Sequence, residues 1–374
     1  MGMRKTLKNL TTLLLCAALL FPHITALADH EESDAEAFTV IREGEMEELI
    51  DTYLSENRIS RDSIGIGFLY TATGEEWYYH GDQFFYSASL YKVPLLMLVS
   101  NKVARGELEQ DALIERRTLT EMEEAILTVS NNTYAHILMN TFWPNNRDCR
   151  ALWPALAGME LTDMPADFVK TSEFSARFMT RVMYTLYKNP ESYPMMLEFL
   201  KQATPEKFFR YQLEGQYEIA QKFGDYGEFR HVSGIIYTEH PIIVTYMTEG
   251  VRAHGQFSSD LAKRLVAYAK TLDARLEEHE QELQRQREEE AERRRAEEAA
   301  AAEEARQAEE AAARAALAEQ ERIEAEAAAA AKAAGEARTR TLLLIAGGVC
   351  AAAAGVLSIG LRKKRKQTEK GKRT

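Results

Sequence analysis

A serine and a lysine three residues apart, Ser89 and Lys92, form a pair whose types and spacing could do chemistry. They precede the apolar run from Val93 to Leu98, which predicts that both lie at the start of a helix, one turn apart on one face. The amine can then take the proton of the hydroxyl, provided that a partly buried, electropositive site lowers the pKa of the lysine. Free N–H groups at a helix start also favour a developing oxyanion. The pair alone is a weak signal, because a helix cap beside a surface lysine has the same spacing.

A second polar group, Ser130-Asn131-Asn132, follows one apolar helical stretch and precedes another. The hydroxyl of Ser130 could pass a proton to a leaving group, and the amide of Asn132 could hold a substrate carbonyl. The alternative is an ordinary polar turn that caps the next helix. For this group taken alone, the alternative is the better explanation.

A third group, Lys222-Phe223-Gly224, has strand character and is followed by Asp225. A lysine that points from an edge strand into a cleft could bind a substrate carboxylate, and a glycine lets the backbone come close to a ligand. The backbone N–H of Asp225 could complete an oxyanion hole with that of Ser89. Taken alone, an exposed strand lysine is the better explanation of this group.

The elements around the three groups indicate one α+β domain from about residue 35 to 275, long enough for a substantial core. The patterns predict, in chain order, a helix over 43–56, strands over 63–70 and 75–80, a helical middle over 89–187, strands over 217–224, 232–238 and 242–248, and a helix over 256–276. Strands, then helices, then strands and a helix favour an antiparallel sheet in a three-layer plan. The first and last helices should cover one face of that sheet.

The order of the three groups resembles that of the penicillin-recognising serine hydrolases, and over residues 64–250 it is similar to the class A β-lactamase-like family. The resemblance implies a β-lactamase/transpeptidase-like fold, an antiparallel sheet with helices, without cofactor or metal. It also implies a role for each residue: Ser89 is the acylated nucleophile, Lys92 its general base, Ser130 a proton relay, Asn132 a contact to the substrate amide, Lys222 the partner opposite Ser130, and Gly224 and Asp225 line the bound substrate.

Two departures from that family lower the expected turnover. Family enzymes carry a glutamate on a long loop after Ser-x-Asn, and it activates the water that frees the acyl-enzyme. Here the loop is short, its acids Glu160, Asp163 and Asp167 are typical of surface charge, and a helix is expected to start within 171–177. Phe223 also stands where the family has a small hydroxyl residue that binds the substrate carboxylate. We therefore expect slow deacylation.

The two ends of the chain indicate export and membrane attachment. A basic start, an apolar run over 10–21 and Ala26-Leu27-Ala28 predict a signal peptide over 1–28, with an uncleaved anchor as the alternative. Residues 341–361 carry no charge and predict one transmembrane helix, and the basic residues that open the tail over 362–374 favour a cytoplasmic location. We expect a single-pass protein of a bacterial cell membrane with its folded domain outside.

Residues 276–338 consist almost wholly of Ala, Glu, Arg and Gln, which are strong helix formers. They predict a charged helical stalk, either a coiled coil or a single helix. Leu272, Leu276 and Leu283 begin an apolar seam that is not sustained, so any self-association through the stalk should be weak. A flexible charged linker is the alternative.

The net charge and the cysteine usage argue against nucleic acid binding and against a disulfide-linked fold. The net charge of −12 argues against nucleic acid as a partner, because phosphate backbones demand a basic face. Cys149 alone lies in the expected exported domain, which leaves no disulfide framework there. We predict a serine hydrolase that forms a Ser89 acyl-enzyme on β-lactams or D-alanyl (peptidoglycan) peptides. A slowly deacylating penicillin-binding, DD-peptidase-like enzyme is the second hypothesis, and a non-catalytic cell-wall-binding module on a stalk is the third.

Overall fold

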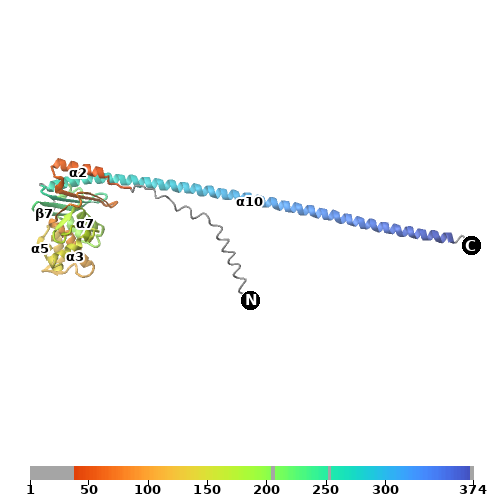
Figure 1. Ribbon diagram of the computed structural model, residues 1–374, viewed down its shortest axis with the longest axis horizontal. Helices are drawn as coiled ribbons and strands as arrows, with labels where there is room; N and C mark the ends of the chain where they lie inside the picture. Colours follow the sequence, from red (N-terminus) through yellow and green to blue (C-terminus); the bar gives the residue numbers. More distant parts are fainter. Residues whose placement is uncertain (1–37, 204–206, 252–253, 371–374) are drawn as a thin grey trace. The chain divides into compact units, whose positions relative to one another are not determined.

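The computed structural model describes residues 38–203, 207–251 and 254–370 (Figure 1). The expected signal peptide and the last four residues of the expected cytoplasmic tail lie outside the described residues. The chain divides into two compact units, Met1–Glu280 and Gln281–Thr374. The three groups singled out in the sequence belong to the first unit.

A five-stranded antiparallel sheet forms the centre of the first unit, with the strand order β2-β1-β9-β8-β7. Its strands are β1 (Ile64–Tyr70), β2 (Glu75–Tyr79), β7 (Glu218–Tyr226), β8 (Phe229–Tyr237) and β9 (Ile242–Glu249). All five expected strands are confirmed, with ends within three residues of the expected ones. β8 begins earlier than expected because a two-residue turn, Gly227-Glu228, pairs Tyr226 directly with Phe229.

Helices cover both faces of this sheet. On one face, α2 (Glu43–Asn57) and the first turns of α10 (His254–Lys370) bury an apolar stripe that includes Ile50 and Leu265 against strand residues such as Val244. The other face packs against a helical layer made of α3 (Lys92–Ala104), α4 (Leu119–Thr128), α5 (Asn132–Phe142), α6 (Asn146–Leu156), α7 (Ala176–Lys188) and α8 (Met196–Lys201). A short helix, α9 (Arg210–Leu213), precedes β7. The expected three-layer plan, with the first and last helices on one face, is confirmed.

The prediction that residues 89–187 are helical is wrong at three short strands. β4 (Leu113–Ile114) and β5 (Arg117–Thr118) form a small hairpin before α4. β6 (Glu173–Ser175) pairs with β3 (Phe84–Tyr86), so the helix expected to start within 171–177 starts only at its end. Ser175 accepts a hydrogen bond from the N–H of Phe178 at 3.2 Å and caps α7, which fixes the first helical residue as Ala176.

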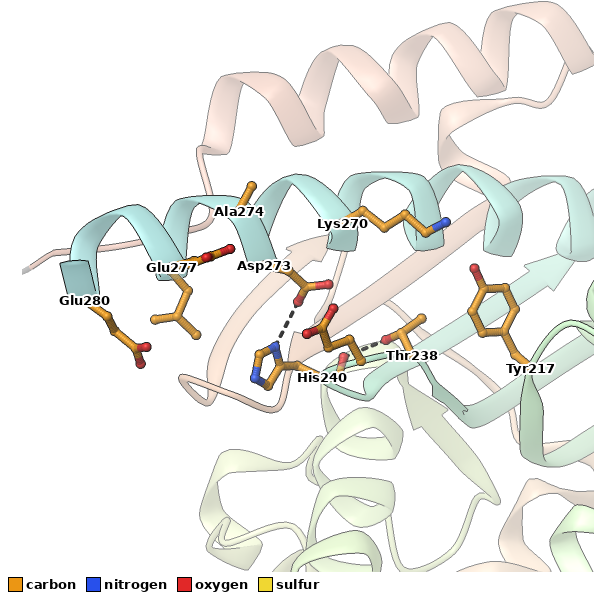
Figure 2. Close-up of a pocket in the computed structure, with 10 residues that line it drawn as sticks. Tyr217, Thr238, His240, Lys270, Asp273, Ala274, Glu277 and Glu280 are labelled. Carbon is orange, nitrogen blue, oxygen red and sulfur yellow. Dashed lines mark hydrogen bonds and ion pairs between the residues drawn. The ribbon is translucent and has the colours of Figure 1, made fainter.

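A polar cluster fastens α10 to the sheet. The hydroxyl of Tyr70, at the end of β1, donates to Oδ1 of Asp273 on α10 at 2.7 Å. His240, in the turn between β8 and β9, places Nδ1 3.0 Å from the same oxygen (Figure 2). Burial raises the pKa of Tyr70 above its ordinary value, which keeps the hydroxyl a donor.

The substitution Asp273→Ala should lower the free energy of unfolding by about 1–3 kcal/mol, because the buried hydroxyl of Tyr70 loses a charged acceptor. Urea denaturation of the full chain in detergent micelles, followed by the fluorescence of the first unit's tryptophans, measures this change. Asp111→Ala, at an exposed position, is the matched control and should change the free energy by less than about 0.5 kcal/mol. Equal stability of the two variants would contradict the anchoring role of Asp273.

The described part of the second unit is the remainder of α10, as far as Lys370. The expectation of helix over 276–338 is confirmed, and ion pairs four residues apart, such as Arg293–Glu297 at 3.6 Å, lie along it. Among the described residues, one stretch of helix is long and apolar enough to cross a membrane by its length and composition, and it is exposed in this chain. Its apolar side chains include Leu343, Leu344 and Val349.

Candidate active site

Ser89 lies in a short 3₁₀ turn, η2 (Ala88–Tyr91), that runs directly into α3. Of the two residues, only Lys92 belongs to the α-helix, whereas Ser89 lies in the 3₁₀ turn before it. The two side chains nevertheless meet as expected, because Nζ of Lys92 is 3.0 Å from Oγ of Ser89. Ala88 has a φ of 46°, a left-handed conformation that is strained for a residue with a side chain. Ser89 is half-buried and Lys92 is fully buried.

Ser130 and Asn132 lie where α4 gives way to α5, and both contact the Lys92 amine. Oγ of Ser130 is 2.9 Å from Nζ of Lys92, and Oδ1 of Asn132 is 2.6 Å from it. The side chain of Asn131 caps α5 by accepting a hydrogen bond from the N–H of Tyr134 at 3.0 Å. The polar turn therefore caps the helix and also supplies side chains to the cluster around Lys92. Ser130 has a φ of 59°, and this left-handed residue turns both its hydroxyl and its carbonyl toward Lys92.

The four oxygens around the Lys92 amine fix how it uses its hydrogens. The carbonyl of Ser130, at 2.7 Å, and the amide oxygen of Asn132 can only accept. A neutral amine has two N–H donors for these acceptors and one lone pair, which is left for a hydroxyl. Burial lowers the pKa of Lys92 to about 8, so the neutral form is accessible near neutral pH. The lone pair can then accept the proton of Ser89.

Lys222 reaches the same hydroxyl group from edge strand β7. Its Nζ lies 3.0 Å from Oγ of Ser130 and 2.8 Å from the carbonyl of Phe223, and the side chain is fully buried. Burial lowers the pKa of Lys222 well below its ordinary value, and the nearby Lys92 lowers it further. The hydroxyl of Ser130 thus contacts two buried amines, one of which also contacts Ser89.

Gly224 lets β7 lie directly against the turn that carries Ser89. A Cβ at this position would lie 3.1 Å from the carbonyl oxygen of Ser87 and 3.2 Å from the backbone nitrogen of Ser89. The register set by the Tyr226–Phe229 pair directs the N–H of Asp225 away from β8, toward the free edge of the sheet. The backbone of β7 therefore borders the same space as the N–H of Ser89.

Two residues at this strand were missed by the sequence reasoning. The ring of Phe208, just before α9, stacks on that of Phe223 with centroids 5.2 Å apart. Arg230 on β8 lies 3.5 Å from the carboxylate of its cross-strand partner Asp225. The hairpin turn would have indicated Arg230 through its pairing with Asp225, whereas no local pattern relates Phe208 to β7.

The loop acids are surface charge, as expected. Glu160 and Asp163 cap the short turn η3 (Leu161–Asp163), where the N–H of Glu160 donates to the carboxylate of Asp163 at 2.8 Å. Both side chains and that of Asp167 are exposed. Their positions give no reason to assign them a part in the chemistry at Ser89.

A pocket of about 540 Å³ lies at the C-terminal end of β8, between the β8–β9 turn and α10 (Figure 2). It surrounds the anchoring pair His240 and Asp273, with Lys270 and Glu277 nearby. The hydrogen bonds of Asp273 to Tyr70 and His240, which hold α10 against the sheet, account for the polar side chains at this pocket.

The three-layer fold, with serine–lysine, Ser-x-Asn and Lys-x-Gly groups at one place, is that of the β-lactamase-like serine hydrolases. The chain belongs to the β-lactamase enzyme family, whose model matches residues 45–269. No curated protein matches the sequence. The expected membership and fold are confirmed.

Several solved structures share the fold at low sequence identity. A putative class A β-lactamase from Rhodopseudomonas palustris is 21% identical with a TM-score of 0.52, and the match covers 59% of this chain and 99% of that one. A β-lactamase from Chitinophaga pinensis is 16% identical, with the same TM-score and the same coverage. The last common ancestor of Gram-negative bacterial class A β-lactamases is 22% identical with a TM-score of 0.52, over 59% of this chain and 98% of that one.

Proposed function

We propose that this protein is a serine hydrolase that forms an acyl-enzyme through Ser89 on β-lactams or D-alanyl peptides. One observation carries the proposal: the Ser130 hydroxyl contacts the buried amines of both Lys92 and Lys222, and the Lys92 amine also contacts the Ser89 hydroxyl. A binding module needs no such cluster. Burying two amines next to each other is costly, and such costly arrangements cluster at functional sites.

Acylation follows from the contacts of Lys92. The neutral amine takes the proton of Ser89 as Oγ bonds to the substrate carbonyl carbon, and the carbonyl oxygen becomes an oxyanion. The N–H groups of Ser89 and Asp225 donate to that oxyanion, and Gly224 allows the two to come close. When the bond to the leaving group breaks, Ser130 gives its proton to the leaving nitrogen or oxygen and takes one from Lys92. Asn132 holds the amide of the acyl part.

Deacylation requires a water that attacks the ester carbon and loses a proton, so that an acid is released and Ser89 regains its hydrogen. The exposed acids of the short loop are poorly suited to this work, because Glu160 and Asp163 are occupied with each other. Hydrolysis should then be slow. This feature favours the second candidate, a slowly deacylating penicillin-binding enzyme.

The same proposal includes the expected organisation of the chain. The signal peptide over 1–28 directs the hydrolase domain, 35–275, outside the cell, and residues 276–338 form a charged stalk. Residues 341–361 cross the membrane, which leaves the basic tail 362–374 in the cytoplasm. The exposed apolar stretch of α10 supports the crossing, and the continuous helix supports the stalk.

A fluorescent penicillin should label Ser89 with one adduct per chain, and the adduct should persist for minutes because the loop acids do not activate water. Time-resolved mass spectrometry of the full chain in detergent micelles measures the adduct and the released product. Ser89→Ala is the control and should give no label. Rapid loss of the label with steady hydrolysis would show that another group supplies the base. Absence of any Ser89-dependent adduct would reject β-lactam chemistry.

A further inference from the structure

Two segments that are far apart in the sequence supply the proposed oxyanion hole. The N–H of Ser89 belongs to the turn η2, which follows β3, and the N–H of Asp225 belongs to β7 in the β7–β8 hairpin. Both donors must lie about 2.7–3.1 Å from the oxyanion, so a small relative shift of the two segments weakens the hole. The reaction therefore depends on how the turn is held against the hairpin.

His231 on β8 makes a direct hydrogen bond between these two segments. The imidazole is fully buried, and its Nε2 lies 2.7 Å from the carbonyl oxygen of Tyr86, the last residue of β3. His231 is also the cross-strand partner of Gly224, whose Cβ direction meets Ser87 and Ser89. The hydrogen bond thus joins the hairpin to the chain three residues before Ser89, beside the place where β7 touches the turn.

The contacts of the ring determine which nitrogen carries the proton. The backbone N–H of Thr248 on β9 donates to Nδ1 of His231 at 3.1 Å, so Nδ1 is an acceptor without a proton. Nε2 of the neutral imidazole then carries the proton and donates to the carbonyl of Tyr86. The rings of Phe85 and Phe229 flank the imidazole, with centroids 6.1 and 6.2 Å from it. His231 is therefore fixed in position and in tautomer.

The turn that follows Tyr86 is strained and needs support from its surroundings. Ala88 has a φ of 46°, and such a residue persists only where the structure around it holds it. On one side, Ser172 holds Ser87: its carbonyl accepts the N–H of Ser87 at 2.6 Å, and the two hydroxyls are 2.8 Å apart. On the side of the sheet, the hydrogen bond from His231 holds the carbonyl of Tyr86. Without that bond, the turn would stay with Ser172 and shift relative to β7.

We propose that His231 is a positioning residue that holds the N–H groups of Ser89 and Asp225 at the spacing an oxyanion requires. The inference rests on the proposed acyl transfer to Ser89. The ring acts through the carbonyl of Tyr86, because it is fully buried and out of reach of a substrate. A displacement of the turn by about 1 Å is enough to slow such a reaction about a hundredfold.

The substitutions H231Q and H231N separate the two hydrogen bonds of the ring. The amide nitrogen of Gln reaches the position of Nε2 and donates to Tyr86, whereas Asn replaces Nδ1 with an amide oxygen and is too short to reach Tyr86. Each variant leaves one buried backbone group without its side-chain partner, so both should lower the midpoint of thermal unfolding to a similar extent. The rate of Ser89 labelling by the fluorescent penicillin, measured with the full chain in detergent micelles, should stay within about threefold of the wild type in H231Q and fall about ten- to hundredfold in H231N.

The pH profile of the same rate shows which part of the site is affected. Burial lowers the pKa of Lys92 to about 8, and Lys92 is unchanged in H231N, so its profile should keep the shape of the wild-type profile at a lower rate throughout. H80N is the matched control at an exposed histidine whose φ of 46° asparagine also accepts, and it should leave the rate unchanged. Equal slowing of H231Q and H231N, or acylation of H231N at the wild-type rate, overturns the inference.

Nitrogen-15 NMR of the histidine-labelled wild type tests the same contact without any variant. Among the histidines whose side chains the structure describes, His231 is the buried one, so its ring N–H should exchange slowly with solvent. We expect this slowly exchanging proton on Nε2. A labelled Ser89 together with the proton on Nδ1 rejects the positioning role alone. If the wild type gives no Ser89-dependent adduct, the proposed function itself fails.

Discussion

Replacing Lys92 by Met should slow the acylation of Ser89 about a thousandfold, since a general base contributes about 10²–10⁴ to such a step. Met fills the buried space of the lysine stem but has no lone-pair nitrogen to take the serine proton. Stopped-flow measurement of labelling by the fluorescent penicillin gives the rate. Lys102→Met on the same helix, which removes an amine paired with Glu107, is the control and should leave the rate unchanged.

The pH dependence of the same rate identifies the group that Lys92→Met removes. Burial lowers the pKa of Lys92 to about 8, and the neutral amine is the reactive form. The rate in the wild type should therefore fall about tenfold for each pH unit below 8 and level off above it. Lys92→Met should lose this dependence. A Lys92→Met protein within fivefold of the wild type, or a profile that is flat from pH 6 to 9, would falsify the assignment of Lys92 as the base.

Gly224→Ala should have the second large effect and slow acylation about a hundredfold, as the loss of one oxyanion donor does. The added methyl group meets the backbone of Ser87 and Ser89 at 3.1 and 3.2 Å, and backbone atoms cannot rotate away from it. β7 must then move from the turn, and the N–H of Asp225 moves with it. The same strain should lower the free energy of unfolding by about 1 kcal/mol.

Gly44→Ala is the matched control for this substitution. A Cβ at Gly44, on α2, meets nothing within 4 Å, so the change should leave acylation unaltered and the helix slightly more stable. Steady-state labelling and thermal unfolding of the two variants give the comparison. Acylation by the Gly224→Ala protein at the wild-type rate would show that the close approach of β7 is unimportant for the chemistry.

The sequence was informative where a local pattern determines structure. The five strands of the sheet and the two helices on its outer face have clear apolar periods, and the three polar groups are recognisable from spacing alone. The prediction that the three polar groups lie together around Ser130 came from the resemblance to the β-lactamase-like family, because no single sequence pattern indicates it. The register of a sheet brings Lys222 to a turn far away in sequence, and no window of residues contains that information.

The features that the sequence did not predict depend on tertiary contacts. Glu173–Ser175 is a strand because β3 offers it a partner, although its residues also suit a helix start. Phe223 was understood only as the loss of a hydroxyl. Its second role, covering the Lys222 ammonium with Phe208 behind it, arises from a stacking contact between separate segments. Left-handed φ angles at Ala88 and Ser130 also depend on the packed site around them.

The last core helix of the first unit continues without interruption into the second unit as α10, and this continuity has a consequence for proteolysis. Leu261, Leu265 and Leu272 of α10 belong to the core, and the helix continues without a loop past residue 280. Proteases cut extended chain, and exposed loops supply it. Release of the first unit from the proposed membrane helix would require part of α10 to unwind, and a cut before Leu272 would remove core side chains. We therefore expect proteases to separate the first unit from the proposed membrane helix only slowly.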